Sequence, residues 1–133
     1  MISQVIIKSI TPKNENGLPH GEWISYWENG VIRKISNYNN GKLFGIVKGY
    51  EKTGSLSYEF EYLDNVIHGI VNSYNEGLIM NSYMCKNGFK TGREHEYSYF
   101  KNKLLCINSS FNIKNMNNQI IQDGEFLTLT YLK

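Results

Sequence analysis

The sequence predicts an all-β protein, an elongated single-layer twisted antiparallel sheet built of consecutive β-hairpin repeats. Three observations support this fold class. Glycine and tyrosine recur with a period of 23–24 residues, two turn signals fall within each period, and the chain contains no alanine. Alanine is the best helix former, and its absence together with abundant Gly, Asn, Tyr and Ile favours strands and turns. The length of 133 residues fits one domain, residues 1–133.

The repeat is defined by a glycine and by a tyrosine five residues later. The glycines are Gly21, Gly45, Gly69 and Gly92, at spacings of 24, 24 and 23, and the tyrosines are Tyr26, Tyr50, Tyr74 and Tyr97. A period of this length indicates stacked supersecondary units. We expect these eight residues to be structural, because one residue type in one position across neighbouring hairpins is typical of packing.

Each repeat is expected to contain two turns. Three-residue hairpin loops with glycine in the left-handed region are predicted at Glu28-Asn29-Gly30, Lys52-Thr53-Gly54 and Asn75-Glu76-Gly77. A looser turn is predicted at Asn39-Asn40-Gly41, Asp64-Asn65 and Lys86-Asn87-Gly88. The period then holds two strands of about seven residues and leaves no room for a helix, so the sheet has some ten strands.

Alternation along the strands predicts one mainly apolar face. It is clearest where Leu56, Tyr58, Phe60 and Tyr62 share one face and Ser57, Glu59 and Glu61 share the other. We interpret the two glutamates as a solvated face, which is the ordinary way to keep a sheet soluble.

The two ends depart from the repeat and are expected to cap the array. Residues 1–17 predict an N-terminal cap strand, with Ser3–Ile10 as its core, and residues 18–100 hold about four repeats. Residues 101–133 predict a degenerate C-terminal cap hairpin, with strands Leu104–Phe111 and Glu125–Leu132, a loop over 112–118 and a turn at Asp123-Gly124. The edges of an open sheet must be capped or paired, which leaves an edge-strand dimer open.

Composition excludes several classes of function. The formal net charge is +2, which argues against a nucleic-acid binder, and the 14% of aromatic residues argue against disorder. The N-terminal apolar stretch is too short for a signal peptide, and no run is long enough for a membrane span. We expect a cytoplasmic protein with Cys85 and Cys106 reduced and packed in apolar surroundings.

The sequence shows no catalytic constellation, so we expect neither an enzyme nor a cofactor or metal site. His20 and His68 both precede a repeat glycine, which favours a role in a turn. His95-Glu96 begins like a zincin motif but has no second histidine four residues on.

The first repeat, Gly21-Glu-Trp-Ile-Ser-Tyr-Trp-Glu-Asn-Gly30 followed by Tyr38 and Asn40-Gly41-Lys42-Leu43, resembles the MORN repeat, in particular its bacterial variant. The resemblance covers Leu18 to about Phe100 and weakens along the chain, with Val47 and Glu94 in the tryptophan position. It implies a ribbon of hairpins without an active site, and bacterial members are often the antitoxin or immunity partner of a toxin.

The leading hypothesis is therefore a non-enzymatic protein-binding module, most concretely an immunity protein that occludes a cognate toxin. Candidate partner-binding residues are an aromatic pair, Trp23 and Trp27, and an acidic set, Glu51, Glu59, Glu61 and Asp64. The acidic set would complement the basic site of a nuclease toxin, and exposed aromatic residues anchor partners.

Three alternatives remain open. A membrane-surface scaffold would use the basic residues Lys86, Lys90, Arg93, Lys101 and Lys103, although Glu94 and Glu96 interrupt them and membrane association is not expected. Choline-binding repeats share Gly, Trp and Tyr but have shorter periods and are secreted. An enzyme with a site assembled from scattered residues is the third.

Overall fold

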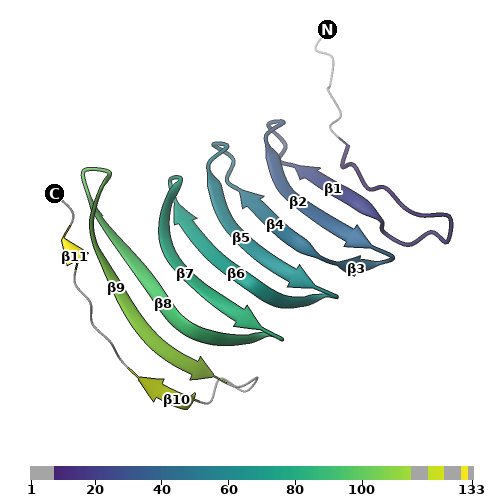
Figure 1. The fold of residues 1–133 in the computed structure, drawn as a ribbon. Coiled ribbons are helices and arrows are strands. Elements are labelled where there is room, and N and C mark those ends of the chain that lie inside the picture. Colours follow the sequence, from purple (N-terminus) through teal and green to yellow (C-terminus); the bar gives the residue numbers. More distant parts are fainter. Residues whose placement is uncertain (1–7, 115–119, 125–129, 132–133) are drawn as a thin grey trace, which may run out of the picture.

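The computed structural model describes residues 8–114, 120–124 and 130–131, which form one open antiparallel sheet (Figure 1). Nine strands lie side by side in the order β1-β2-β4-β5-β6-β7-β8-β9-β10, while β3 pairs with β2 and β11 pairs with β9. The predicted fold class is confirmed. The strands are β1 (Gly21–Tyr26), β2 (Ile32–Asn39), β3 (Lys42–Leu43), β4 (Gly45–Tyr50), β5 (Leu56–Leu63), β6 (Val66–Asn75), β7 (Leu78–Lys86), β8 (Phe89–Phe100), β9 (Lys103–Lys114), β10 (Ile120–Gly124) and β11 (Thr130–Tyr131).

Helices are absent from the described part of the chain. Within these residues, accordingly, no helix has the length and apolar character needed to span a bilayer.

The first two repeats contain the predicted three-residue loops. The Trp27 N–H donates to the Val31 carbonyl (2.8 Å), and the Gly30 N–H donates back to the Trp27 carbonyl (3.0 Å), with φ of 88° at Gly30. The second repeat has the same pair of bonds around Gly54, where φ is 93°. Glycine is needed here because the left-handed region costs other residues about 1 kcal/mol.

The other turns are tighter than predicted. In the third repeat Asn75 pairs with Leu78, so the loop has two residues, Glu76 and Gly77, both with positive φ. This shorter loop accounts for the residue that the third repeat lacks. The turns expected to be looser are also two-residue turns with positive φ, at Asn40-Gly41, Asp64-Asn65 and Asn87-Gly88. Such type I′ turns match the right-handed twist of a hairpin.

Two of these turns are each stabilised by a hydrogen bond to a different histidine. Nδ1 of His20 accepts the Asn40 N–H, and Nδ1 of His68 accepts the Asn87 N–H, both at 3.2 Å. The two histidines thus sit in equivalent positions, with the structural role that their spacing suggested.

Each hairpin carries a β-bulge near its loop. The register shifts between Ser25 and Tyr26 in the first hairpin, and equivalent shifts recur at Gly49/Tyr50, Ser73/Tyr74 and Ser98/Tyr99. The returning strand holds one extra residue at each shift, namely Arg33, Ser57, Met80 and Leu105. In the fourth hairpin the bulge follows Ser98, so Tyr99 occupies the position next to the bulge and Tyr97 lies two residues before it.

The repeat glycines mark a second irregularity between hairpins. All four have positive φ, at 102° for Gly21, 71° for Gly45, 121° for Gly69 and 73° for Gly92. Near Gly69 and Gly92 the strand contains extra residues that have no partner on the preceding strand. The register therefore shifts at Phe60/Tyr62 and at Ser82/Met84. Bulges bend strands and increase their twist, and the longer strands, β5 to β9, curve in the same sense in Figure 1.

Cross-strand partners share a face, so the register defines two faces. The aromatic face carries Trp23, Tyr38, Tyr58, Phe60, Tyr62 and Tyr83 around the buried Ser36, Val47 and Val71. The opposite face carries Ile35, Ile46, Lys48, Glu59, Glu61, Ile70, Asn72 and Met84. The predicted row of Tyr58, Phe60 and Tyr62 is confirmed, whereas Leu56 pairs with Tyr50 beyond the bulge and leaves that row.

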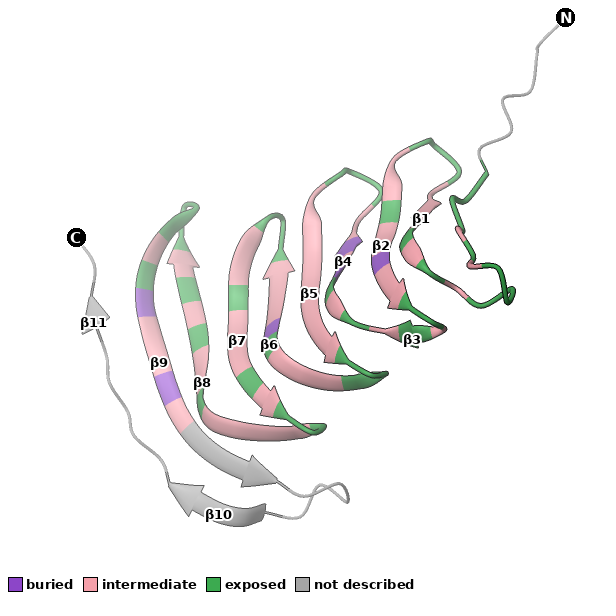
Figure 2. Cartoon of the chain, turned by 45° about the vertical axis from the view of Figure 1, so that its right-hand side comes forward, coloured by how far each residue is buried: buried purple, intermediate pink, exposed green. Residues whose placement is uncertain are grey.

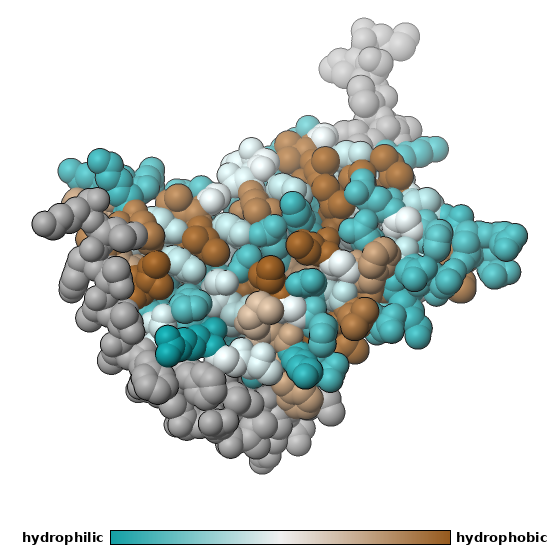
Figure 3. Space-filling model, in the orientation of Figure 1, coloured by the Kyte–Doolittle hydropathy of each residue, from teal (hydrophilic) through white to brown (hydrophobic). Residues whose placement is uncertain are grey.

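The sheet has little enclosed core. Among the described residues only Val47, Val71 and Cys106 are buried hydrophobic side chains, and most strand residues are intermediate in exposure (Figure 2). Figure 3 shows hydrophobic side chains scattered over one face between hydrophilic ones, rather than gathered in a single patch.

The two ends are only partly as predicted. Ile10 forms a bridge with Ile24 on the outer side of β1, and residues 3–7 of the predicted cap strand lie outside the described residues. The predicted loop over 112–118 is wrong for residues 112–114, because they continue β9 and pair with β10. Asp123 and Gly124 belong to β10 instead of a turn. Of the predicted strand Glu125–Leu132, residues 130–131 form β11, and residues 125–129 and 132 lie outside the described residues.

Candidate functional site

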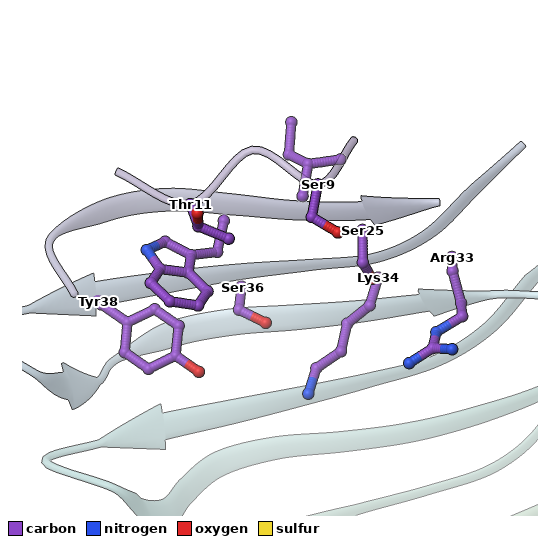
Figure 4. Close-up of a pocket in the computed structure, with 9 residues that line it drawn as sticks. Ser9, Thr11, Ser25, Arg33, Lys34, Ser36 and Tyr38 are labelled. Atoms are coloured by element: carbon purple, nitrogen blue, oxygen red, sulfur yellow. The ribbon is translucent and has the colours of Figure 1, made fainter. Parts of the chain in front are cut away.

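Trp23 forms a wall of a hollow at the N-terminal end of the aromatic face. Its indole N–H donates to the Pro12 carbonyl (2.7 Å), and its ring lies 5.1 Å from the Tyr38 ring at an interplanar angle of 54°. The hollow has a volume of about 280 Å³. Besides the two rings, hydroxyl-bearing and cationic side chains line it, from Ser9, Thr11, Ser25, Ser36, Arg33 and Lys34 (Figure 4).

Trp27 lies in a second hollow, of about 380 Å³. Its indole N–H donates to the Tyr50 carbonyl of the next repeat (2.9 Å). The Arg33 guanidinium and the Lys52 ammonium each lie 5.4 Å from the centre of its ring. The two tryptophans therefore do not form one patch. Each is held by a backbone carbonyl, and each lines a hollow of its own.

Arg33 and Lys34 join the two hollows, since both residues line both. Consecutive residues of a regular strand point to opposite faces. The bulge at Ser25/Tyr26 makes Arg33 an extra residue, so that its side chain turns to the same side as that of Lys34. In Figure 4 the two side chains extend from β2 in the same direction.

A cationic aromatic strip is therefore defined by Trp23, Trp27, Arg33, Lys34, Tyr38 and Tyr58. Gly49 contributes space to it, because it is the cross-strand partner of Lys34 and the Tyr58 ring occupies the place that a Cβ on Gly49 would take. Among the described residues, none that lines the first hollow is acidic, and Glu51 is the one acidic residue that lines the second.

The structure does not bring the predicted acidic set together. Glu51 lies in the loop after β4, Asp64 lies in the turn at the other end of β5, and Glu59 and Glu61 lie in the middle of the opposite face. Four residues so distributed do not make one complementary patch.

Glu59 and Glu61 are half-buried and engaged in the sheet, which corrects the interpretation of a solvated face. Glu59 accepts the hydroxyl proton of Tyr74 and lies 3.8 Å from the Lys48 ammonium. Glu61 accepts the Ile70 N–H (3.0 Å). Burial, the hydrogen bond to Glu59 and the negative charge of Glu59 together raise the pKa of Tyr74 to about 12. Reversing either charge would thus remove bonds within the sheet as well as change its surface.

The basic residues proposed for a membrane surface are also dispersed. Lys90 pairs with Glu94 (2.8 Å) and lies over the Tyr83 ring, on the aromatic face. Lys86 precedes the turn at one end of β8, whereas Lys101 lies in the turn at its other end. Arg93 pairs with Phe111 of β9 and Lys103 begins that strand.

The remaining candidates have structural surroundings. Nδ1 of His95 lies 2.7 Å from Oγ of Ser109. Burial raises the pKa of the Cys85 thiol, which disfavours the reactive thiolate, and Cys106 is buried. In the described part of the chain, no group of three or more His, Cys, Asp or Glu side chains is placed to hold a metal ion.

Arg33 and Lys34 are the residues that the sequence did not reveal. Lys34 is a charged residue on the strand face that the alternation predicts to be mainly apolar, and that departure from the pattern is the signal that points to it. No protein-family model matches the chain, and a comparison with curated proteins gives no match.

Proposed function

We propose that this chain is a non-enzymatic protein-binding repeat module, and most concretely an immunity or antitoxin protein that neutralises a toxin by direct binding and occlusion. The observation that carries the proposal is the openness of the sheet. Within the described residues both faces remain substantially accessible, and few side chains are enclosed.

The exposed area supports this function. One face of nine strands, at a spacing of about 4.8 Å and a length of about 20 Å, provides roughly 800 Å², which is the area that each partner contributes to a standard interface. A sheet of this size is large enough to cover the mouth of an enzyme's active site.

The more specific part of the proposal depends on the resemblance of the first repeat to bacterial MORN-variant repeats. The open hairpin sheet agrees with the architecture that this resemblance implies. Fold analogy does not define function, so the toxin partner needs a direct test.

The test is co-expression of the tagged chain with the product of the neighbouring gene. Stoichiometric co-purification together with rescue of growth supports an immunity protein, and an unrelated toxin serves as the control. Failure of both binding and rescue would reject the immunity function. Sedimentation with anionic vesicles examines the alternative, since salt-sensitive binding would favour a membrane-surface scaffold.

A further inference from the structure

The first repeat differs from the others at the positions that surround its bulge. The residue pair at the bulge is Arg33-Lys34 in the first hairpin, but Ser57-Tyr58, Met80-Asn81 and Leu105-Cys106 in the next three. Both tryptophans of the chain also belong to the first repeat. All four hairpins have this bulge although the residues at it differ, so the bulge alone does not require Arg33 and Lys34.

Within the described residues, the two cations of the strip form no ion pair with a carboxylate. The ion pairs found in the described part of the chain are Lys48–Glu59, Lys52–Glu28 and Lys90–Glu94, and none involves Arg33 or Lys34. Arg33 instead lies against the Trp27 ring, which fixes its position without neutralising its charge. A guanidinium and an ammonium side by side in a hollow create a site for a carboxylate.

The surroundings of the two cations specify more than charge. Trp23 and Tyr38 present tilted rings on one side of Lys34, while Trp27 and Tyr58 line the hollow on its other side. Hydroxyl groups of Ser25 and Ser36 add hydrogen-bonding capacity to the first hollow. A ligand that follows the strip thus meets an aromatic surface, a cationic centre and a second aromatic surface.

We propose that the cationic aromatic strip binds an extended acidic segment of a partner protein. A carboxylate of that segment accepts hydrogen bonds from Arg33 and Lys34, and an adjacent aromatic side chain packs against Trp23 and Tyr38. This inference rests on the proposed protein-binding function and names the surface that performs it. It commits to an acidic partner, where the sequence had suggested a basic one.

Tryptophan fluorescence provides a direct measurement, because the chain has two tryptophans and both line the strip. The probe is a random Glu/Tyr copolymer, which supplies carboxylates beside aromatic rings. A saturable change in tryptophan emission that weakens with added salt is expected. Polyglutamate should bind more weakly, and a Lys/Tyr copolymer should not bind.

The double variant Arg33→Gln/Lys34→Gln should weaken binding of the Glu/Tyr copolymer at least tenfold. Its matched control is Lys86→Gln/Lys103→Gln, which removes the same charge away from the strip and should bind as the wild type does. Circular dichroism establishes that both variants are folded. Equal loss in the two variants, or no saturable change in the wild type, would overturn the proposal.

Two further competition experiments test whether the strip prefers a phosphate group to a carboxylate. Inorganic phosphate or phosphatidylglycerol vesicles that compete with the copolymer at equal or higher affinity would replace the acidic peptide with a phosphate group and refute the proposal. If the cognate partner binds the Arg33→Gln/Lys34→Gln variant normally, the protein-binding function stands and the strip is excluded. If the copolymer binds the strip but no partner is bound in co-expression, the immunity function fails separately.

Discussion

The first and third repeats are both hairpins with a β-bulge beside the loop, but the side chains at equivalent positions differ in kind. In the repeat position two residues after the glycine, the first has Trp23, which lines a hollow, and the third has Val71, which is 4% exposed. The bulge of the first repeat presents Arg33 and Lys34, whereas that of the third presents Met80 and Asn81.

The candidate binding residues thus lie in the first repeat, whereas the enclosed residues that stabilise the sheet lie in the central repeats. Central hairpins have neighbours on both sides, so their side chains can be enclosed, as at Val47 and Val71. The first hairpin has one full neighbouring hairpin and a short bridge to Ile10, so its large side chains stay accessible. An array stabilised by contacts between neighbours can therefore carry a binding surface at one end at small cost to the rest.

Substitutions in the shared position should separate the two roles. We expect Val71→Ala to lower the free energy of unfolding by about 2 kcal/mol, because it leaves a void in one of the few enclosed sites. It should leave binding of the Glu/Tyr copolymer unchanged. Trp23→Phe should cost about 1 kcal/mol, through loss of the bond to Pro12, and should weaken binding. Urea unfolding and copolymer titration measure both quantities. Parallel losses in both properties would contradict the separation.

The repeat glycines provide a second comparison. Gly45→Ala should cost about 1 kcal/mol, since its φ of 71° is strained for alanine but the space around it is open. Gly69→Ala should cost about 2 kcal/mol, because its new Cβ would also overlap with Glu61 and displace the carboxylate from the Ile70 N–H. Thermal and urea unfolding compare the two variants. A smaller effect at Gly69 than at Gly45 would show that Glu61 can move away freely.

The histidine positions should respond alike in the two repeats. His20→Ala and His68→Ala each remove the acceptor for an asparagine N–H, and we expect a loss of about 1 kcal/mol in each case. The double variant should show additive losses, because the sites share no partner. Urea unfolding of the three variants tests this expectation, and a clear departure from additivity would indicate coupling between the turns.

A pH-dependent effect is expected in the third repeat under alkaline conditions. The pKa of Tyr74 is raised to about 12 in the folded protein, above its ordinary value of 10.0. The folded state thus holds this proton between pH 10 and 12 when the unfolded state has lost it, so the stabilisation is complete below pH 10 and is lost as pH rises through that window. Tyr74→Phe should reduce the slope of unfolding free energy against pH there. Tyr26→Phe, in the first repeat, controls for removal of a tyrosine. Equal slopes in Tyr74→Phe and the wild type would exclude this contribution.

The fold was accessible to sequence reasoning because the contacts of a hairpin array are local. Glycine spacing and turn residues located the consecutive hairpins, and alternation placed Tyr58, Phe60 and Tyr62 on one face. Loop lengths were less predictable, since Asn75-Glu76-Gly77 reads equally well as a three-residue loop or as a residue followed by a type I′ turn.

The candidate site was less accessible, because it depends on where the strands slip by a residue. Trp23 and Trp27 were recognised as candidates, but the acidic residues chosen with them are distributed over both ends and the opposite face. Arg33 and Lys34 were missed because simple alternation places consecutive residues on opposite faces.

The sequence by itself determined the all-β class, the order of the hairpins and the positions that need glycine or a turn-forming histidine. These follow from short-range rules, in which a residue's conformational freedom and its near neighbours decide the outcome. The tertiary structure alone decided which side chains share a face at and beyond each bulge, because a single bulge reverses the alternation after it. That reversal turns Arg33 to the side of Lys34 and places both cations between the two tryptophans.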